Sequence, residues 1–184
     1  YYATRILAET SAPRTAFRGV EVAANRLIVQ SYLKENAYSG AISFLETLLA
    51  QVHNQDALQE FESLLVLSFF QQGEALKQRG KTNSAAESFW RAYERSTETE
   101  MGPLALFEAA VLWDRPKTRQ KAEEALHLFY VRYPASSLYH PALMRLASLY
   151  QETKRPMKGA EIFEEASRLP VSAALSRKAL DHAI

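Results

Sequence analysis

Residue types that often carry chemistry are scattered along this chain. Its four histidines are His53, His127, His140 and His182. None lies three or four residues from another, so no helix would present two of them to one metal ion. The acidic doublets Glu123-Glu124 and Glu164-Glu165 diverge by about 100° on a helix, so neither forms a facing pair of carboxylates. The chain has no cysteine, which excludes disulfides and thiolate catalysis.

One short segment, Arg79-Gly80-Lys81-Thr82, shares residue types with a phosphate-binding loop. The leading glycine and the preceding strand of that motif are missing, and Gly80 stands where a helix would end. No group of side chains supplies a nucleophile, a base and an orienting residue together. We therefore predict that the chain is not an enzyme and needs no cofactor or metal.

Composition bounds the class of protein. The 184 residues are 47% hydrophobic and 23% charged, which is typical of a folded soluble domain. With 22 basic and 21 acidic residues the net charge is +1, and this balance argues against nucleic-acid binding. The longest apolar run, Leu64 to Leu67, is far shorter than the roughly 18 residues of a membrane-spanning helix. Because the chain opens at Tyr1 without an initiator Met or a signal peptide, we read it as a processed chain or a fragment.

A repeat of 37 residues organises the chain. One set of positions is Phe69, Gly73, Leu76, Ala85, Phe89 and Ala92. The sets 37 and 74 residues later are Leu106, Ala110, Trp113, Ala122, Leu126 and Phe129, then Leu143, Ala147, Tyr150, Gly159, Phe163 and Ala166. Large apolar and small residues recur at matching positions. We call these 18 positions the repeat stations. The pattern predicts pairs of helices that bury their apolar faces by stacking on neighbouring pairs.

The stations resemble the tetratricopeptide-repeat (TPR) pattern. Phe69, Gly73 and Leu76 match its W, G and Y positions, and Pro134 matches the proline that closes a repeat. An earlier copy places Tyr32, Ala41, Leu45 and Leu48 at the Y position, the A position, the F position and the second small position of the pattern. The resemblance implies an all-α fold, a right-handed α-solenoid of stacked antiparallel helix pairs with about four TPR-like repeats and additional terminal helices.

We predict a single domain over residues 1–184. Its repeats are expected at about 20–52, 56–97, 103–134 and 138–169, with a C-terminal helix at 171–184 and a helical segment at 1–10 that ends at Pro13. The first and second copies are 44 residues apart, from Ala41 to Ala85, which is seven more than the later spacing. Seven residues are about two helical turns, so we expect one long helix from about Asp56 to Arg79.

The resemblance also implies a peptide-binding groove, because TPR proteins bind peptides on the concave face lined by the first helix of each pair. In this sequence the positions that would face it are Leu67, Phe70, Glu74, Leu104, Phe107, Val111, Pro141, Met144 and Ser148, with Arg26 and Gln30 from the first copy. These residues are mostly apolar and do not reproduce the Lys, Asn and Arg clamp that some TPR proteins use for peptide carboxylates. We expect a protein partner to bind there through an amphipathic helix or an apolar segment. Alternatively, Phe70 and Phe107 pack between repeats and leave no site.

Charged residues repeat as well. Basic clusters lie at three predicted helix-pair turns: Lys77, Arg79 and Lys81; Arg115, Lys117, Arg119 and Lys121; and Lys154, Arg155 and Lys158. They could meet an anionic surface, or they could simply be cations favoured near helix C-termini. Acidic residues Glu87, Glu124 and Glu161 recur near the starts of second helices, where the helix dipole favours them.

The predicted function is therefore a scaffold or adaptor for protein–protein interaction. The alternative is a structural subunit of a larger complex that packs through the edges and ends of the solenoid. The segment Arg132-Tyr133-Pro134-Ala135-Ser136-Ser137 resembles TPR proteins of the bacterial cell envelope, which favours a bacterial envelope or periplasmic setting over the cytoplasm. The sequence does not identify the partner.

Overall fold

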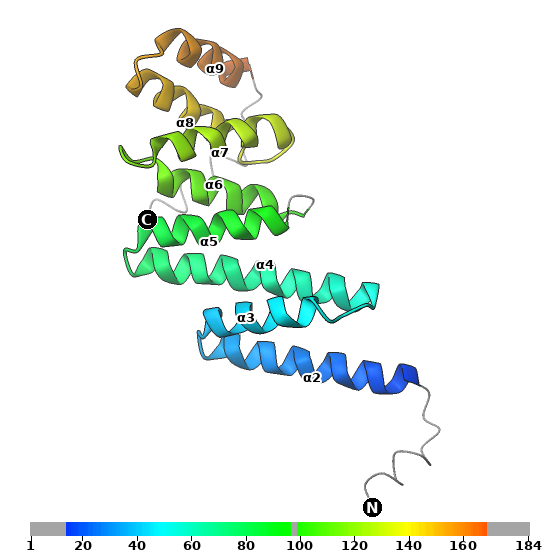
Figure 1. Ribbon diagram of the computed structural model, residues 1–184. Helices are drawn as coiled ribbons and strands as arrows, with labels where there is room; N and C mark the ends of the chain where they lie inside the picture. Colours follow the sequence, from blue (N-terminus) through cyan, green and yellow to red (C-terminus); the bar gives the residue numbers. More distant parts are fainter. Residues whose placement is uncertain (1–13, 97–98, 169–184) are drawn as a thin grey trace, which may run out of the picture. The chain divides into compact units, whose positions relative to one another are not determined.

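The computed structural model describes residues 14–96 and 99–168 of the chain, and all regular secondary structure within these ranges is α-helical. The helices are α2 (Arg14–Lys34), α3 (Tyr38–Leu49), α4 (Gln55–Gln78), α5 (Thr82–Arg95), α6 (Met101–Trp113), α7 (Arg119–Arg132), α8 (Tyr139–Glu152) and α9 (Pro156–Arg168) (Figure 1). The predicted all-α class is confirmed, and the succession of helix pairs is consistent with an α-solenoid. The helices predicted at 1–10 and 171–184, and the break at Pro13, lie outside the described residues.

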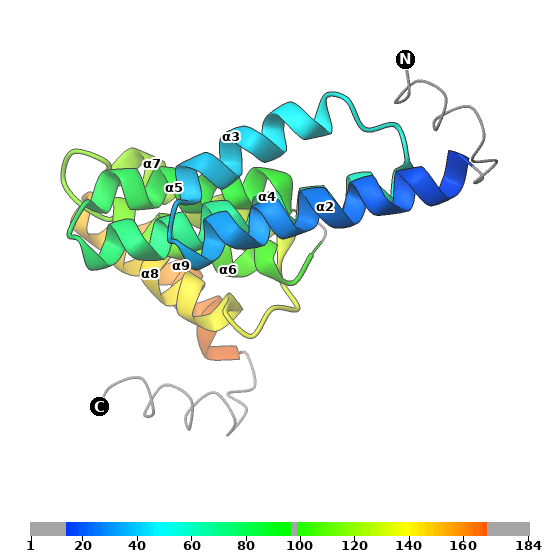
Figure 2. The same cartoon turned by 90° about the horizontal axis from the view of Figure 1, so that it is seen from below.

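The chain divides into two compact units, Tyr1–Ser68 and Phe69–Ile184, and the division falls within α4. In unit 1, α2 packs against α3 (Figure 2), and the rings of Tyr32 and Phe44 lie 6.3 Å apart between them. Each predicted repeat range holds two helices, although α2 begins at Arg14, before the expected residue 20. That the whole chain forms a single domain stays a prediction.

The long helix predicted from the 44-residue spacing is confirmed, because α4 runs unbroken from Gln55 to Gln78. Its start is capped by Asn54, whose side-chain oxygen accepts a hydrogen bond from the Ala57 N–H at 2.9 Å. This satisfies a backbone donor that the first turn of a helix leaves without a partner. The helix ends at Gln78, and Gly80, with a φ of 70°, closes the turn that follows, at the position where the sequence predicts a helix end.

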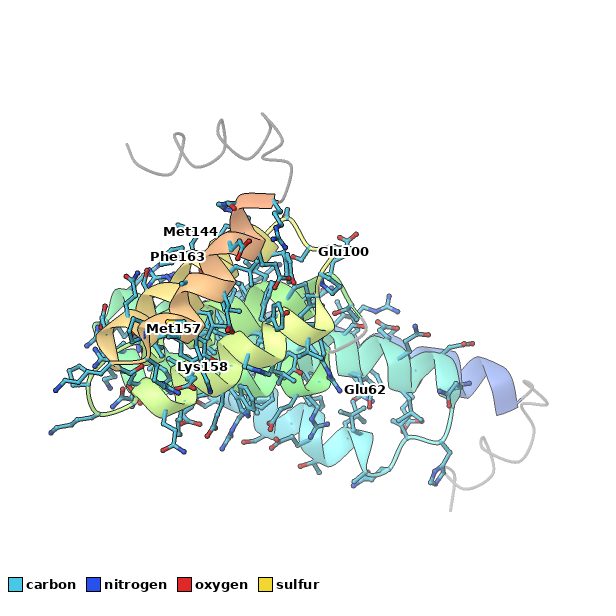
Figure 3. All side chains as sticks on the ribbon, turned by 90° about the horizontal axis from the view of Figure 1, so that it is seen from above. Glu62, Glu100, Met144, Met157, Lys158 and Phe163 are labelled. Atoms are coloured by element: carbon cyan, nitrogen blue, oxygen red, sulfur yellow. The ribbon has the colours of Figure 1, made fainter. Side chains whose placement is uncertain are left out.

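In unit 2 each helix from α5 to α8 packs against the next one along the chain (Figure 1). Of the 18 repeat stations, 16 are buried, so the 37-residue period does mark the core. The exceptions, Leu76 and Phe163, are half-buried. Phe163 belongs to α9, the last described helix, as Figure 3 shows.

Small residues at the stations allow helices to approach closely. A Cβ atom added at Gly73 would lie 3.0 Å from the Phe89 ring, and one added at Gly159 would lie 3.0 Å from the Ala147 carbonyl oxygen. Both glycines are buried where the two helices of a pair meet. A side chain at either position would push the pair apart, and close packing leaves little space to absorb that shift.

A shared carboxylate joins α7, α8 and α9, the last three helices that the structure describes. Tyr130 of α7 and Tyr139 of α8 donate their phenol O–H groups to the two oxygens of Glu165 on α9, at 3.0 and 3.1 Å. The two rings stack with an interplanar angle of 11°. Burial, together with the hydrogen bond to Glu165, raises the pKa of Tyr139 to about 12, so this phenol keeps its proton well above neutral pH.

The turns at Asn36, Gly80 and Lys154 use the same cap. Each residue has a positive φ, of 56°, 70° and 58° respectively. In the last turn the Arg155 N–H donates to the Tyr150 carbonyl at 2.8 Å, and the Lys154 N–H donates to the Gln151 carbonyl at 3.2 Å. This hydrogen-bond pattern ends a helix with one left-handed residue, a role that glycine fills best. A lysine there is conformationally strained.

We expect Lys154→Gly to stabilise the protein. Removing Cβ relieves a left-handed conformation that costs about 1–2 kcal/mol. Glycine also makes the unfolded chain more flexible, which lowers stability by about 0.5–1 kcal/mol. The free energy of unfolding should therefore rise by about 0.5–1 kcal/mol. Urea denaturation followed by circular dichroism measures it. The matched control is Gly80→Ala, which should lower stability. An unchanged or lower midpoint for Lys154→Gly would contradict the strain argument.

Candidate functional site

The first helices of unit 2 carry a row of apolar side chains that the stack does not bury. We call this set the first-helix row: Phe70 on α4, Leu104, Phe107 and Val111 on α6, and Pro141 and Met144 on α8. Leu104 and Met144 are 39% and 40% exposed, and Met144 is labelled in Figure 3. The other four are half-buried. The polar residues predicted beside them, Glu74 and Ser148, are half-buried and exposed respectively.

The two phenylalanines of the row also contact the core. The Phe70 ring meets Phe89 edge to face with centroids 5.0 Å apart, and the Phe107 ring meets Phe129 in the same way at 6.1 Å. Each contact joins a first helix to the second helix of its own pair. Because both rings stay half-buried, one side of each supports the pair while another side remains accessible to solvent.

Ion pairs join consecutive first helices. The Lys77 ammonium lies 2.7 Å from the Glu108 carboxylate, and the Arg145 guanidinium lies 3.2 Å from Asp114. Asp114 follows Lys77 by 37 residues and Arg145 follows Glu108 by 37, so the same joint recurs with its charges exchanged. Burial acts to lower the pKa of Lys77, but the hydrogen bond to Glu108 and the charges of Glu108 and Glu74 raise it overall. These charges are therefore largely neutralised within the protein.

Three of the predicted site residues, Arg26, Gln30 and Leu67, belong to unit 1, and their surroundings are given within that unit. Arg26 makes a two-pronged ion pair with Glu60, with one N–O distance of 2.9 Å. Gln30 is exposed and Leu67 is half-buried. Their participation in one surface with the first-helix row stays a prediction.

Internal pairing accounts for part of the predicted basic clusters. Lys77, Arg119, Lys121 and Arg155 each contact a carboxylate on another helix. Lys121 reaches Glu87 at 2.5 Å and Arg119 reaches Glu152 at 2.7 Å. Glu87 therefore joins α5 to α7 through this ion pair. The sequence analysis explained Glu87 by the helix dipole alone and did not predict the pair. Spacing along the chain could not show these pairs, since the partners lie about a repeat apart.

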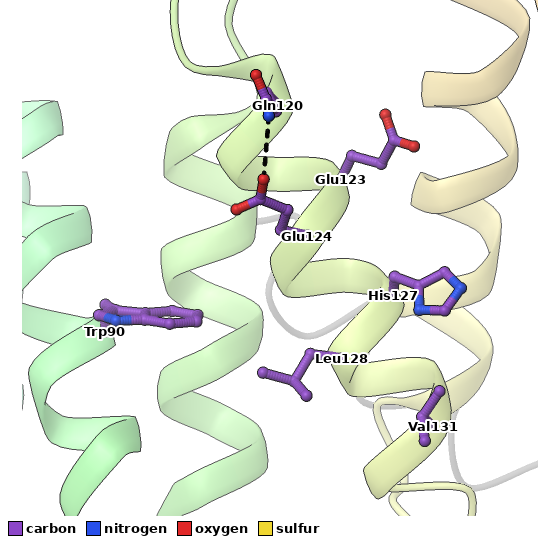
Figure 4. A pocket seen from close by; sticks show the side chains of 7 residues that line it. All are labelled: Trp90, Gln120, Glu123, Glu124, His127, Leu128 and Val131. Carbon is purple, nitrogen blue, oxygen red and sulfur yellow. Dashed lines mark hydrogen bonds between the residues drawn. The ribbon is translucent and has the colours of Figure 1, made fainter.

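A hollow of about 680 Å³ lies on the second helices, on the side formed by α5 and α7. We call it the α5–α7 hollow. Its lining is Trp90, Gln120, Glu123, Glu124, His127, Leu128 and Val131. In Figure 4 Trp90 extends from one helix, Glu124 and Leu128 point toward it from α7, and Glu123 and His127 turn to the other side of α7. The sequence analysis did not predict this hollow.

Trp90 is held in place by its neighbours. Its indole N–H donates to Glu94 at 2.8 Å, and its ring lies 5.5 Å from Trp113 and 5.3 Å from Tyr93. The side chain is nevertheless half-buried rather than buried. A large aromatic ring is thus fixed in position with part of its surface open.

The two carboxylates of the hollow have different partners. Glu123 receives a two-pronged hydrogen bond from Arg155, one arm at 2.7 Å, and that interaction lowers the pKa of Glu123. Glu124 accepts a hydrogen bond from the Gln120 amide at 3.2 Å (Figure 4), and within the described residues it forms no ion pair with a lysine or arginine. The negative charge of Glu124 is therefore available to a ligand.

Neither a metal site nor a membrane span is found in the part of the chain that the structure describes. No three His, Asp or Glu side chains there come together in a way that would hold a metal ion. No described helix combines the length and the apolar character needed to cross a bilayer. That the protein is not an enzyme stays a prediction.

No family model and no curated protein matches this chain. Among solved structures, one that matches is described as MamA AMB-1, with 17% sequence identity and a TM-score of 0.33. The match covers 86% of this chain and 97% of that chain.

The Glu123–Arg155 pair predicts a contribution to acid stability. A carboxyl group whose pKa is lowered by folding stabilises the protein above its unfolded pKa, and that contribution is lost as pH falls through the folded pKa. We expect the melting temperature of the wild type to fall more steeply than that of Glu123→Gln between about pH 5 and pH 3. Glu124→Gln, which removes no ion pair, is the control and should follow the wild type. Parallel melting curves against pH for wild type and Glu123→Gln would contradict a contribution of the Glu123–Arg155 pair to stability.

Proposed function

We propose that this protein is a scaffold for protein–protein interaction that binds a peptide or an amphipathic helix of a protein partner on the first-helix row. The supporting observation is the exposure of Leu104 and Met144, at 39% and 40%, beside the half-buried rings of Phe70 and Phe107. Apolar side chains left open to water, at positions that recur from repeat to repeat, are what an interaction surface would require.

The charges that flank the row favour an apolar partner segment. Lys77 and Glu108 neutralise each other, as do Asp114 and Arg145. A partner therefore meets few unpaired charges and gains mostly from burying its own apolar side chains. An amphipathic helix places such side chains at intervals of three and four residues along one face, which suits a row drawn from successive helices.

Further parts of the proposal rest on the sequence. Leu67, Arg26 and Gln30, which belong to unit 1, are included among the partner-binding residues from their positions in the repeat pattern alone. The segment from Arg132 to Ser137 favours a bacterial envelope or periplasmic setting, with the cytoplasm as the alternative. The TPR character of the repeats rests on the station pattern and on the helix pairs that follow it.

A structural-subunit role is the second candidate, and exposed apolar residues away from the row favour it. Leu27 and Ile28 are adjacent on α2 and are 65% and 41% exposed, while Met157 on α9 is 76% exposed. Residues of this kind would be covered if neighbouring subunits packed against unit 1 or against the last helix pair.

Site-specific photo-crosslinking in the native host tests the scaffold function. We expect benzoylphenylalanine at position 107 to capture a discrete protein, and the same group at Glu161, an exposed position on α9, to capture none. Adding Leu104→Glu and Met144→Glu should weaken the captured complex at least about tenfold, because each burial is worth about 1.5 kcal/mol or more. Mass spectrometry identifies the adduct, and purified partner then gives the affinity.

Two controls separate a lost site from a lost fold. Met157→Glu adds the same charge outside the row and should leave the affinity unchanged, and circular dichroism should show equal helix content in all variants. Capture at Glu161 alone, or at neither position, would favour the structural-subunit role. An unaltered affinity in the Leu104→Glu/Met144→Glu protein would contradict binding on the row.

A further inference from the structure

The α5–α7 hollow differs from the rest of the second-helix surface in a way that the repeats themselves reveal. Trp90 corresponds to His127 and Glu164 in the following repeats. Leu128 corresponds to Arg91 and Glu165, and Val131 corresponds to Glu94 and Arg168. At each of these three positions the fold accepts polar or charged residues, so stacking does not require the apolar ones found here.

Three apolar departures from the repeat thus meet in one hollow. Val131 is 62% exposed, and Trp90 and Leu128 are half-buried. A half-buried tryptophan whose indole N–H is already satisfied loses no hydrogen bond when a ligand covers it. Rigid aromatic residues of this kind often supply much of the binding energy of a protein interface.

The charge of the lining indicates what the ligand carries. Two of the seven lining residues, Glu123 and Glu124, are acidic, and none is Lys or Arg. Arg155 neutralises Glu123, whereas among the described residues Glu124 contacts the Gln120 amide and no cation, so its carboxylate is open to an external cation. Glu94, which receives the Trp90 indole N–H, adds a further negative charge beside the ring. An arginine or lysine near these groups would gain both an ion pair and the attraction of the aromatic face.

We propose that the α5–α7 hollow is a second protein-binding site, which takes a short segment of a partner protein with an arginine or lysine next to a large apolar side chain. The apolar side chain contacts Trp90, Leu128 and Val131, and the cation pairs with Glu124. A volume of about 680 Å³ suits a few side chains rather than a whole helix. The site is separate from the first-helix row, because it is formed by α5 and α7 instead of α4, α6 and α8.

Nuclear magnetic resonance on the purified protein tests this site through its two tryptophans. The probe is an eight-residue peptide with a Leu-Arg-Leu centre, and the comparison peptides have Leu-Glu-Leu and Ser-Arg-Ser centres. We expect the Leu-Arg-Leu peptide to shift the indole N–H signal of half-buried Trp90 saturably, while the signal of buried Trp113 changes little. Each comparison peptide should bind at least about tenfold more weakly, because it lacks one of the two interactions.

Variants taken from the other repeats probe the hollow with little risk to the fold. Val131→Arg, which copies the residue at position 168, should abolish the shift by repelling the cation and removing an apolar contact. Glu124→Gln should weaken binding by about threefold to tenfold and reduce its dependence on salt between about 0.05 M and 0.5 M. Met157→Arg adds the same charge on exposed α9 and is the matched control, which should bind like the wild type.

Each remaining outcome would overturn the proposal. The site does not exist if no peptide shifts Trp90, or if Val131→Arg and Met157→Arg behave alike. Charge complementarity fails if the Leu-Glu-Leu peptide binds equally well. If Leu104→Glu/Met144→Glu abolishes the shift while Val131→Arg does not, the peptide occupies the first-helix row, and only the proposed function survives.

Discussion

Close approach of helices at small residues is the constraint on which the rest of unit 2 depends. Gly73 and Gly159 lie where an added Cβ would come within 3.0 Å of the partner helix, and alanines occupy the matching stations between them. Helices held this close bury the large stations almost completely, and that burial is the main term opposing the conformational entropy of the chain. Since the stations occupy most of the inner surface of each helix, residues between the stations are free to differ from repeat to repeat.

Much of this fold follows from the sequence, because the buried positions recur every 37 residues and the period therefore identifies them. The stations, the length of α4 and the cap at Gly80 were all predictable in this way. Contacts between helices were not. Lys77 meets Glu108 and Lys121 meets Glu87 across a separation of about one repeat, and the choice of partner depends on the angle and offset between neighbouring helices. A repeat pattern fixes neither quantity, so cation clusters that suggested an anionic ligand include residues already paired inside the protein.

The α5–α7 hollow escaped the sequence analysis for a related reason. Trp90, Leu128 and Val131 match no station, and a search for regularity passes over residues that depart from it. Their signal is the departure itself, since Arg91, Glu94 and His127 show what the same positions carry elsewhere. Comparing repeats within one chain is therefore informative in two ways. Positions where the residue type recurs mark the side chains that hold the stack together, and positions where it differs mark side chains that the stack does not need.

The two proposed surfaces occupy different helix layers of one unit, yet they share a core. Phe107 of the first-helix row packs on Phe129, which is buried on α7 next to Leu128 of the hollow. Coupling between the surfaces would require this contact to have two alternative arrangements, because a ligand shifts only an equilibrium whose states it binds differently. Phe129 is fully buried among close-packed rings, at 5.4 Å from Tyr133 as well as 6.1 Å from Phe107, and a second packing of these side chains would open a cavity. We therefore expect the two proposed surfaces to act independently, with binding at one leaving the affinity of the other unchanged.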